Sequence, residues 1–183
     1  MYGLIIGVDC GTNGAITYVK LKDGKPMAHP TVVKMPKDFK ALNRYLREIT
    51  DGMDRCICFI EKVWLNPGDM IGGKAFNMQK LVKNYNEICN ALDANDIGYI
   101  DVPARTWQND LNLRLSKEEA KKESDTMRKN RYKRVAQVYF KTITCTLWNS
   151  DALLILYFGL KKLNYDKPYI MDNLPAQDLD LLF

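Results

Sequence analysis

Three acidic residues of this chain stand at the ends of apolar segments, where a strand or a helix would hold a carboxylate in a fixed place. Asp9 closes the run Leu-Ile-Ile-Gly-Val-Asp, Glu61 closes Cys-Phe-Ile-Glu, and Asp151 opens Asp-Ala-Leu-Leu-Ile-Leu. Carboxylates in such places are costly unless a counter-charge accompanies them, and one divalent cation that prefers oxygen ligands can serve all three. The pattern therefore predicts a metal site of the kind that suits a metal-dependent nuclease.

Each acid also has a purely structural explanation. Asp9 begins the sequence Asp-Cys-Gly-Thr, and aspartates are common in turns. A similar turn holds the ATP phosphates in actin-like sugar kinases. Glu61 could pair with the adjacent Lys62, and Asp151 could be a first-turn carboxylate favoured by the helix dipole. An actin-like ATPase is disfavoured, because 183 residues are too few for two such domains.

The composition indicates one α/β domain with a proper core, since 46% of the 183 residues are apolar. No continuous apolar run is long enough to span a membrane, and the first apolar segment lacks a secretory signal, so we expect a cytoplasmic protein. The five cysteines are odd in number and form no Cys-x-x-Cys pair. Reduced core thiols are therefore expected, rather than disulfides or a zinc site.

The order of apolar segments predicts a mixed β-sheet with helices on both faces. Strands are expected at 4–9, 15–20, 31–35, 56–61 and 98–102, the first two as a hairpin. Amphipathic helices are expected at 39–49 and at about 76–92, and a buried helix is expected from the polar start 149–151 to 160. These elements form one domain over residues 1–165, and residues 166–183 are expected to wrap the surface as a tail.

The stretch after Pro103 is polar and basic, and eight of its lysines and arginines fall between Lys117 and Arg134. Ser116-x-x-Glu119 has the form of a capping box, but Asp125 and Asn130 disfavour one continuous helix. A mobile segment and a broken helix fit equally well. The net charge of +5 and this cluster suit a polyanionic partner, although the solvated face of a helix would look the same.

Four motifs in this order resemble the RuvC-like Holliday junction resolvases of the RNase H-like superfamily, particularly the compact bacteriophage versions. The resemblance covers about residues 3–160. It is carried by Ile-Gly-Val-Asp-Cys-Gly-Thr-Asn-Gly-Ala-Ile at 6–16, Ile-Glu-Lys-Val-Trp-Leu-Asn-Pro-Gly at 60–68, Val-Pro-Ala-Arg-Thr-Trp at 102–107 and Ser-Asp-Ala-Leu-Leu-Ile at 150–155. It implies an RNase H-like α/β fold, with a sheet of about five strands flanked by helices on both faces.

The resemblance also implies an activity, which is paired phosphodiester hydrolysis at four-way DNA junctions by a homodimer. Asp9, Glu61 and Asp151 would be the catalytic ligands of two Mg²⁺ or Mn²⁺ ions, and Lys129 would contact the scissile phosphate, with Lys133 as second choice. Further contacts with branched DNA are expected from lysines and aromatic residues, namely Lys74, Lys80, Lys83, Trp64 and Trp107. For Phe76, core or interface packing is favoured. A phage-encoded protein of this kind would act in the host cytoplasm.

One position departs from the resembled family, which usually has an acid or a histidine three residues before its last acid. Here that position is Trp148, the residue before it is Leu147, and only Asn149 and Ser150 offer neutral oxygens nearby. Two alternatives therefore stay open. The chain could be an RNase H-like nuclease for other branched or hybrid substrates, or a catalytically impaired protein that binds junctions as a scaffold.

Overall fold

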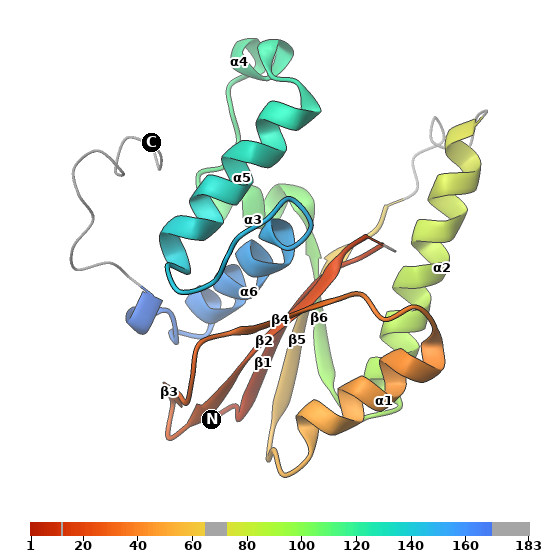
Figure 1. Ribbon diagram of the computed structural model, residues 1–183, viewed down its shortest axis with the longest axis vertical. Helices are drawn as coiled ribbons and strands as arrows, with labels where there is room; N and C mark the ends of the chain where they lie inside the picture. Colours follow the sequence, from red (N-terminus) through yellow and green to blue (C-terminus); the bar gives the residue numbers. More distant parts are fainter. Residues whose placement is uncertain (12, 65–72, 170–183) are drawn as a thin grey trace.

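The computed structural model describes residues 1–11, 13–64 and 73–169 (Figure 1). The strands are β1 (Leu4–Asp9), β2 (Ala15–Lys22), β3 (Lys25–Pro26), β4 (Thr31–Lys34), β5 (Cys56–Lys62) and β6 (Gly98–Pro103). The helices are α1 (Phe39–Thr50), α2 (Gly73–Asp93), α3 (Ala104–Asp110), α4 (Lys117–Lys122), α5 (Asp125–Tyr139) and α6 (Ser150–Lys162), followed by a 3₁₀ turn at Lys167–Tyr169.

The sheet has six strands in the order β3-β2-β1-β5-β6, with β4 also paired to β2. The hairpin β1–β2 is antiparallel, while β5 runs parallel to both β1 and β6. The expected mixed sheet is confirmed, and each of the five expected strands is present. The sixth strand, β3, was not expected, because two residues carry no periodic signal.

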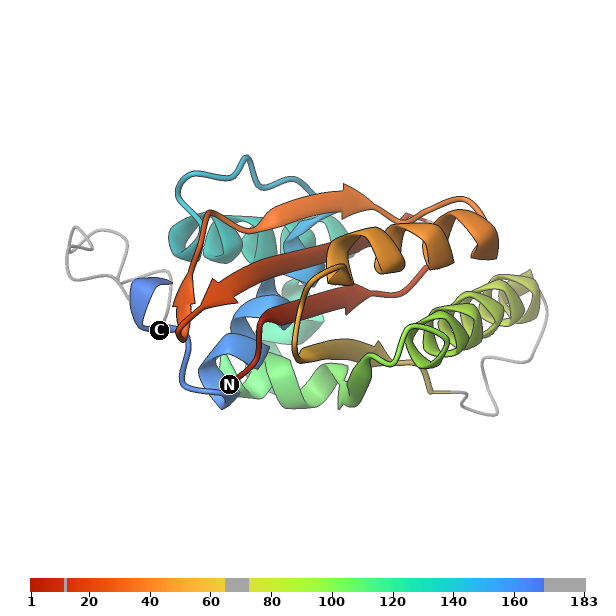
Figure 2. The same ribbon diagram turned by 90° about the horizontal axis from the view of Figure 1, so that it is seen from below.

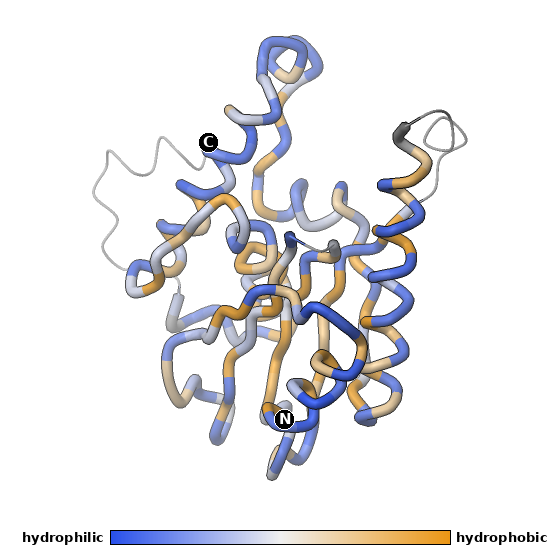
Figure 3. Tube along the Cα trace, turned by 45° about the vertical axis from the view of Figure 1, so that its right-hand side comes forward, coloured by the Kyte–Doolittle hydropathy of each residue, from blue (hydrophilic) through white to orange (hydrophobic). Residues whose placement is uncertain are grey.

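Helices cover both faces of the sheet, as predicted (Figures 1 and 2). Side chains alternate along each strand, so β1 sends Ile6 and Val8 into the core under α1 and α2, and Ile5 into the core under α6. Hydrophobic residues gather along the central strands in Figure 3. The two cores hold the sheet between its helical layers and fix where its strands end.

The region after Pro103 differs in part from the sequence interpretation. The helix α3 was not predicted, since Ala-Arg-Thr-Trp-Gln-Asn-Asp has no clear apolar period. The broken-helix alternative is confirmed, with Ser116 and Ser124 capping α4 and α5 through their side chains. Phe76 on α2 is 61% exposed, so of the core or interface packing favoured for it the core is wrong, and the interface stays a prediction.

The predicted tail falls largely outside the described residues, which end at 169. Its first residues belong with the domain, because the Tyr169 ring packs on Phe140 at 5.4 Å between ring centroids. Among the described residues no helix is both long enough and apolar enough to cross a membrane. All five cysteines are free thiols, as expected.

The backbones of β1 and α6 meet at Gly7. A Cβ placed there would lie 2.5 Å from the Leu156 nitrogen and 2.8 Å from the Ala152 oxygen, so no larger residue fits. Beside it, the Thr17 hydroxyl lies 3.1 Å from the Gly7 oxygen and 3.0 Å from the Ala152 oxygen and is buried. This close approach sets the position of α6, and with it Asp151, relative to Asp9.

We expect Gly7→Ala to push α6 off the sheet and to lower the free energy of unfolding by about 1–3 kcal/mol, the usual cost of overpacking a core. Chemical denaturation measures this directly. Gly98→Ala is the matched control, because a Cβ at that strand position meets atoms only at 3.7 Å and beyond. Equal stabilities for the two variants would contradict the close-contact explanation.

Candidate active site

Asp9 and Glu61 end neighbouring parallel strands. In the register of β1 and β5, Val8 pairs with Ile60, so the next residue on each strand is one of the two acids. Parallel neighbours lie about 4.8 Å apart and end at the same edge of the sheet. Because Val8 and Ile60 face α1 and α2, alternation sends both acids toward the face covered by α6.

Asp151 reaches the same edge from the first turn of α6. The turn before this helix is fixed by Asn149, whose Oδ1 accepts from the Thr146 N–H at 2.7 Å and whose Nδ2 donates to the Thr144 oxygen at 3.2 Å. The Ser150 hydroxyl donates to Asp151 Oδ1 at 3.2 Å. The third carboxylate is thus held by a turn with several side-chain hydrogen bonds, although the buried Thr146 hydroxyl has no partner among the described residues.

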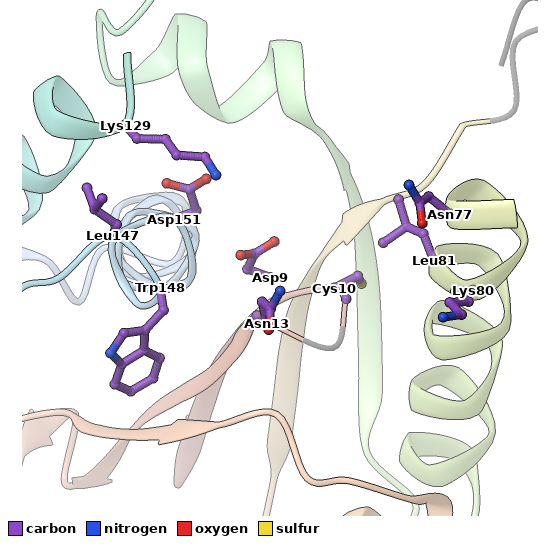
Figure 4. A pocket seen from close by; sticks show the side chains of 12 residues that line it. Asp9, Cys10, Asn13, Asn77, Lys80, Leu81, Lys129, Leu147, Trp148 and Asp151 are labelled. Carbon is purple, nitrogen blue, oxygen red and sulfur yellow. The ribbon is translucent and has the colours of Figure 1, made fainter. Parts of the chain in front are cut away.

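Asp9 and Asp151 line a cleft with a volume of about 780 Å³, whereas Glu61 is not among its lining residues. Figure 4 shows Asp9 at its floor, with Asp151 and Lys129 to one side and the helix α2 to the other. The lining residues are Asp9, Cys10, Gly11, Asn13, Gly14, Asn77, Lys80, Leu81, Lys129, Leu147, Trp148 and Asp151. The cleft therefore spans the gap between α2 and the start of α6.

Burial disfavours charge on all three acids, and repulsion by neighbouring acids adds to this effect at Asp9 and Glu61. Burial raises the pKa of Asp9 well above its ordinary value, and the charges of Asp151 and Glu61 raise it further. Burial and then the charge of Asp151 raise the pKa of Glu61 to about 7. Burial also raises the pKa of Asp151. Without a bound cation, this edge of the sheet therefore resists full ionisation.

Trp107 is 1% exposed and lies in α3, so its ring belongs to the core. Its ring packs edge-on against Tyr132 at 5.7 Å between centroids. The expected DNA contact at Trp107 is corrected accordingly, since no face is free for a base. The indole N–H of Trp107 is near Glu61 and lowers the pKa of that carboxyl. The geometry does not meet the criteria for a hydrogen bond, and this N–H has no other partner among the described residues.

Cations of α5 stand over the acids. Lys129 extends toward Asp151 in Figure 4, and its charge lowers the pKa of both Asp9 and Asp151 against the larger effect of burial. Arg128, which we did not single out from the sequence, acts on Glu61 and Asp151 in the same way. Lys129 therefore faces the carboxylates from α5, while the neighbouring Arg128, which pairs with Asp125 at 3.3 Å, adds its charge nearby.

The helix α5 is held in place by Arg131. Its guanidinium bonds both oxygens of Glu123, at 2.8 and 2.9 Å, and also donates to the Leu113 oxygen. A bidentate pair of this kind is more specific in direction than an ordinary surface ion pair. It ties the start of α5 to the preceding linker and so positions Lys129.

The donor set fits a hard divalent cation. All three acids offer oxygen, all have a raised pKa, and a nearby cation would relieve both burial and repulsion. Within the described residues no three acidic, cysteine or histidine side chains enclose a single point. An open arrangement suits Mg²⁺, which is commonly held by one or two carboxylates while water and substrate phosphates complete its shell.

The other predicted DNA contacts are scattered. Lys80 lines the cleft, with its Nζ 4.2 Å from the centroid of the exposed Phe76 ring, while Lys83 pairs with Glu87 on the surface. Trp64 is 57% exposed, and the Lys62 Nζ lies 4.5 Å from its ring centroid.

Two more of the predicted contacts lie away from the cleft or cannot be placed. Lys133 lies near Cys145, whose pKa it lowers against the larger effect of burial, and it does not line the cleft. The Lys74 side chain is outside the described residues. The lysines therefore do not form one continuous contact surface in the part of the chain that the structure describes.

Besides its lysines, α2 contributes three residues that were not recognised as part of the site. Asn77 and Leu81 line the cleft, and Asn84 accepts a hydrogen bond from the Gly11 N–H at 2.8 Å, which holds α2 against the turn after β1. Their spacing of four and three residues places them on one helix face, and this period could have revealed them. The nearby Cys10 thiol donates to the main-chain carbonyl oxygen of Glu61 at 3.4 Å.

The neutral candidates for a fourth ligand are otherwise engaged. Both polar atoms of the Asn149 side chain bond the turn at Thr144–Thr146, and Ser150 is fully buried against Asp151. Trp148 lines the cleft at the position in question and offers no oxygen. Asn13 also lines this cleft, and its amide side chain lies close to Asp9 in Figure 4.

Comparison with known proteins gives a structural answer only. No protein-family model matches the sequence, and no curated protein matches it. Among solved structures, Thermus thermophilus RuvC in complex with a Holliday junction substrate is similar at 13% identity and a TM-score of 0.52, covering 88% of this chain and 94% of that chain.

Two further solved structures are similar. Thermus thermophilus RuvC alone covers 88% of this chain and 97% of that chain at 12% identity, with a TM-score of 0.50. The yeast mitochondrial Holliday junction resolvase Ydc2 covers 90% and 80% at 12% identity, with a TM-score of 0.44. On the first two of these structures, and on its own mixed sheet with helices on both faces, the chain has a RuvC-like fold.

Proposed function

We propose that this chain is a metal-dependent endonuclease that resolves four-way DNA junctions. The observation that carries the proposal is the meeting of three partly buried carboxylates beside Lys129 and Arg128, two of which, Asp9 and Asp151, line a cleft on a RuvC-like fold. One solved structure with this fold is a complex with a Holliday junction substrate. Branched DNA is therefore the substrate class that best fits the acids and the basic rim together.

In this proposal Asp9, Glu61 and Asp151 hold two divalent cations, Mg²⁺ or Mn²⁺. When bound, such ions supply charge neutralisation at the phosphate and make water a stronger nucleophile. Bound cations would hold the Glu61 carboxylate in its ionised form, in which it would be able to accept a proton from the attacking water. Lys129 would steady the phosphate from the open side of the cleft.

A homodimer would pair two such sites across one junction and cut two strands symmetrically. The basic residues of α5 and of α2 would then lie on the rim of each cleft, where phosphates approach. A scaffold protein is the second candidate, and a specific observation favours it: Trp148 stands where an additional ligand would be expected, and Asn149 and Ser150 are engaged in the turn.

The test is cleavage of a labelled synthetic four-way junction beside a linear duplex of the same sequence, with Mg²⁺, Mn²⁺ or chelator. We expect paired, symmetric nicks in the junction alone, and only when metal is present. Tight junction binding without cleavage in either metal would support the scaffold instead. Equal cleavage of an RNA–DNA hybrid or a flap would show a broader RNase H-like nuclease.

A further inference from the structure

Trp148 is presented to the cleft by a rigid turn. Asn149 closes this turn with two side-chain hydrogen bonds, and the Ser150 N–H donates to the Thr146 oxygen at 3.1 Å. The ring of Trp148 lines the cleft and is partly exposed, while the Trp107 ring is 1% exposed in the core. A partly exposed indole is thus held in a fixed position at the edge of the cleft, three residues before Asp151.

The surroundings of the ring have the charge pattern of a nucleotide site. The Lys34 Nζ lies over the Trp148 ring, 5.4 Å from its centroid, so a stacked base would take the opposite face. Lys129 and Lys80 line the same cleft. An aromatic face next to ammonium groups suits a base stacked on the ring while its phosphate meets a lysine. The cleft volume of about 780 Å³ is within the range of sites that hold a molecule of this size.

Building on the function proposed above, we propose that Trp148, with Lys34 beside it, is the stacking surface for an unstacked nucleobase next to the scissile phosphate. A base inside a linear duplex has both faces covered, so it reaches the ring only after unstacking, which costs a few kcal/mol. A base at a branch point is already partly released. Trp148 therefore makes the cleft selective for distorted or branched DNA.

The test compares Trp148→Ala and Trp148→Phe on junctions whose cut sites have been mapped with the unaltered protein. Stacking of one base is worth about 1–3 kcal/mol, so we expect Trp148→Ala to lower kcat/KM on the junction by roughly 5- to 150-fold. Trp148→Phe should keep most of the rate. Ile100→Ala, which removes an exposed apolar side chain of β6, is the control.

Abasic nucleotides separate stacking from a merely structural role. One abasic nucleotide is placed either just before or just after the cut. At one of these two positions, the cleavage rate of the unaltered protein should fall to the rate that Trp148→Ala shows on the intact junction. The cleavage rate of Trp148→Ala itself should fall little further on the same abasic junction. An effect of Trp148→Ala that is the same with and without the base would overturn the stacking role, as would an unchanged rate on intact junctions.

Fluorescence gives a readout that does not need cleavage. In a chain carrying Asp9→Asn and Trp64→Phe, the emission of Trp148 should be quenched by the junction more than by the linear duplex, with Trp107 as a buried background. Equal quenching by both DNAs would overturn the selectivity. A protein that binds no DNA would overturn the function and the stacking role together, whereas junction cleavage without the Trp148 effects would overturn the stacking role alone.

Discussion

Asp9→Asn is expected to abolish junction cleavage, with a rate loss of at least about a thousandfold. The carboxylate lies at the centre of the site, and the loss of several kcal/mol of charge stabilisation in the transition state costs tenfold per 1.36 kcal/mol. Junction binding should persist, since the lysines on the rim remain. A cleavage assay and a binding titration on the same junction measure the two effects.

The same substitution should stabilise the protein in chelator at pH 8. Asp9 is desolvated by burial and repelled by Asp151 and Glu61, so a neutral isostere removes an unfavourable charge from the folded state. The melting temperature should therefore rise while activity disappears. This opposite pair of effects is typical of a site that gives up stability for function.

Asp23→Asn provides the control. Asp23 is exposed in the β2–β3 turn with φ 51°, a conformation that both aspartate and asparagine adopt readily. Neither cleavage nor stability should change. Retention of more than a tenth of the cleavage rate by Asp9→Asn would contradict the role of Asp9 in catalysis.

The fold was predictable from the sequence where a local pattern determines it. The apolar runs that end at Asp9 and Glu61 predicted both strands, because a buried strand leaves a strong signal in a few residues. The prediction that Asp9 and Glu61 converge assumed that their two strands are neighbours in the sheet, and the sequence did not show this. The pairing of Val8 with Ile60 depends on how distant segments pack, and it brings the carboxylates to one edge of the sheet.

The features that the sequence did not reveal are tertiary. Nothing local shows that Trp107 turns into the core against Tyr132, or that Arg128 faces Glu61 from another helix. Likewise, the oxygens of Asn149 and Ser150 looked available in the sequence, whereas the folded turn uses them. A residue type can suggest chemistry, but its hydrogen-bond partners decide whether it is free to perform it.

The stability of the protein in chelator is expected to fall as pH rises from about 4.5 to about 7. Glu61 has an ordinary pKa of 4.5 and a pKa raised to about 7 by burial and Asp151, so in this window only the folded state keeps the proton. The contribution of Glu61 to the free energy of unfolding is fully present below pH 4.5 and is lost as the pH rises to about 7. The loss amounts to about 3 kcal/mol, at 1.36 kcal/mol per pKa unit. The raised pKa values of Asp9 and Asp151 act in the same direction.

A divalent cation should reverse this trend, because it favours the ionised form of each carboxylate and binds only the folded arrangement. Mg²⁺ or Mn²⁺ should then raise the melting temperature more at pH 8 than at pH 5. Glu61→Gln should flatten the profile in chelator and reduce the gain from metal, whereas Glu87→Gln, whose carboxylate pairs with Lys83 on the surface, should do neither. A flat profile for the unaltered protein, or equal stabilisation by metal at both pH values, would mean that these carboxylates do not form the metal site.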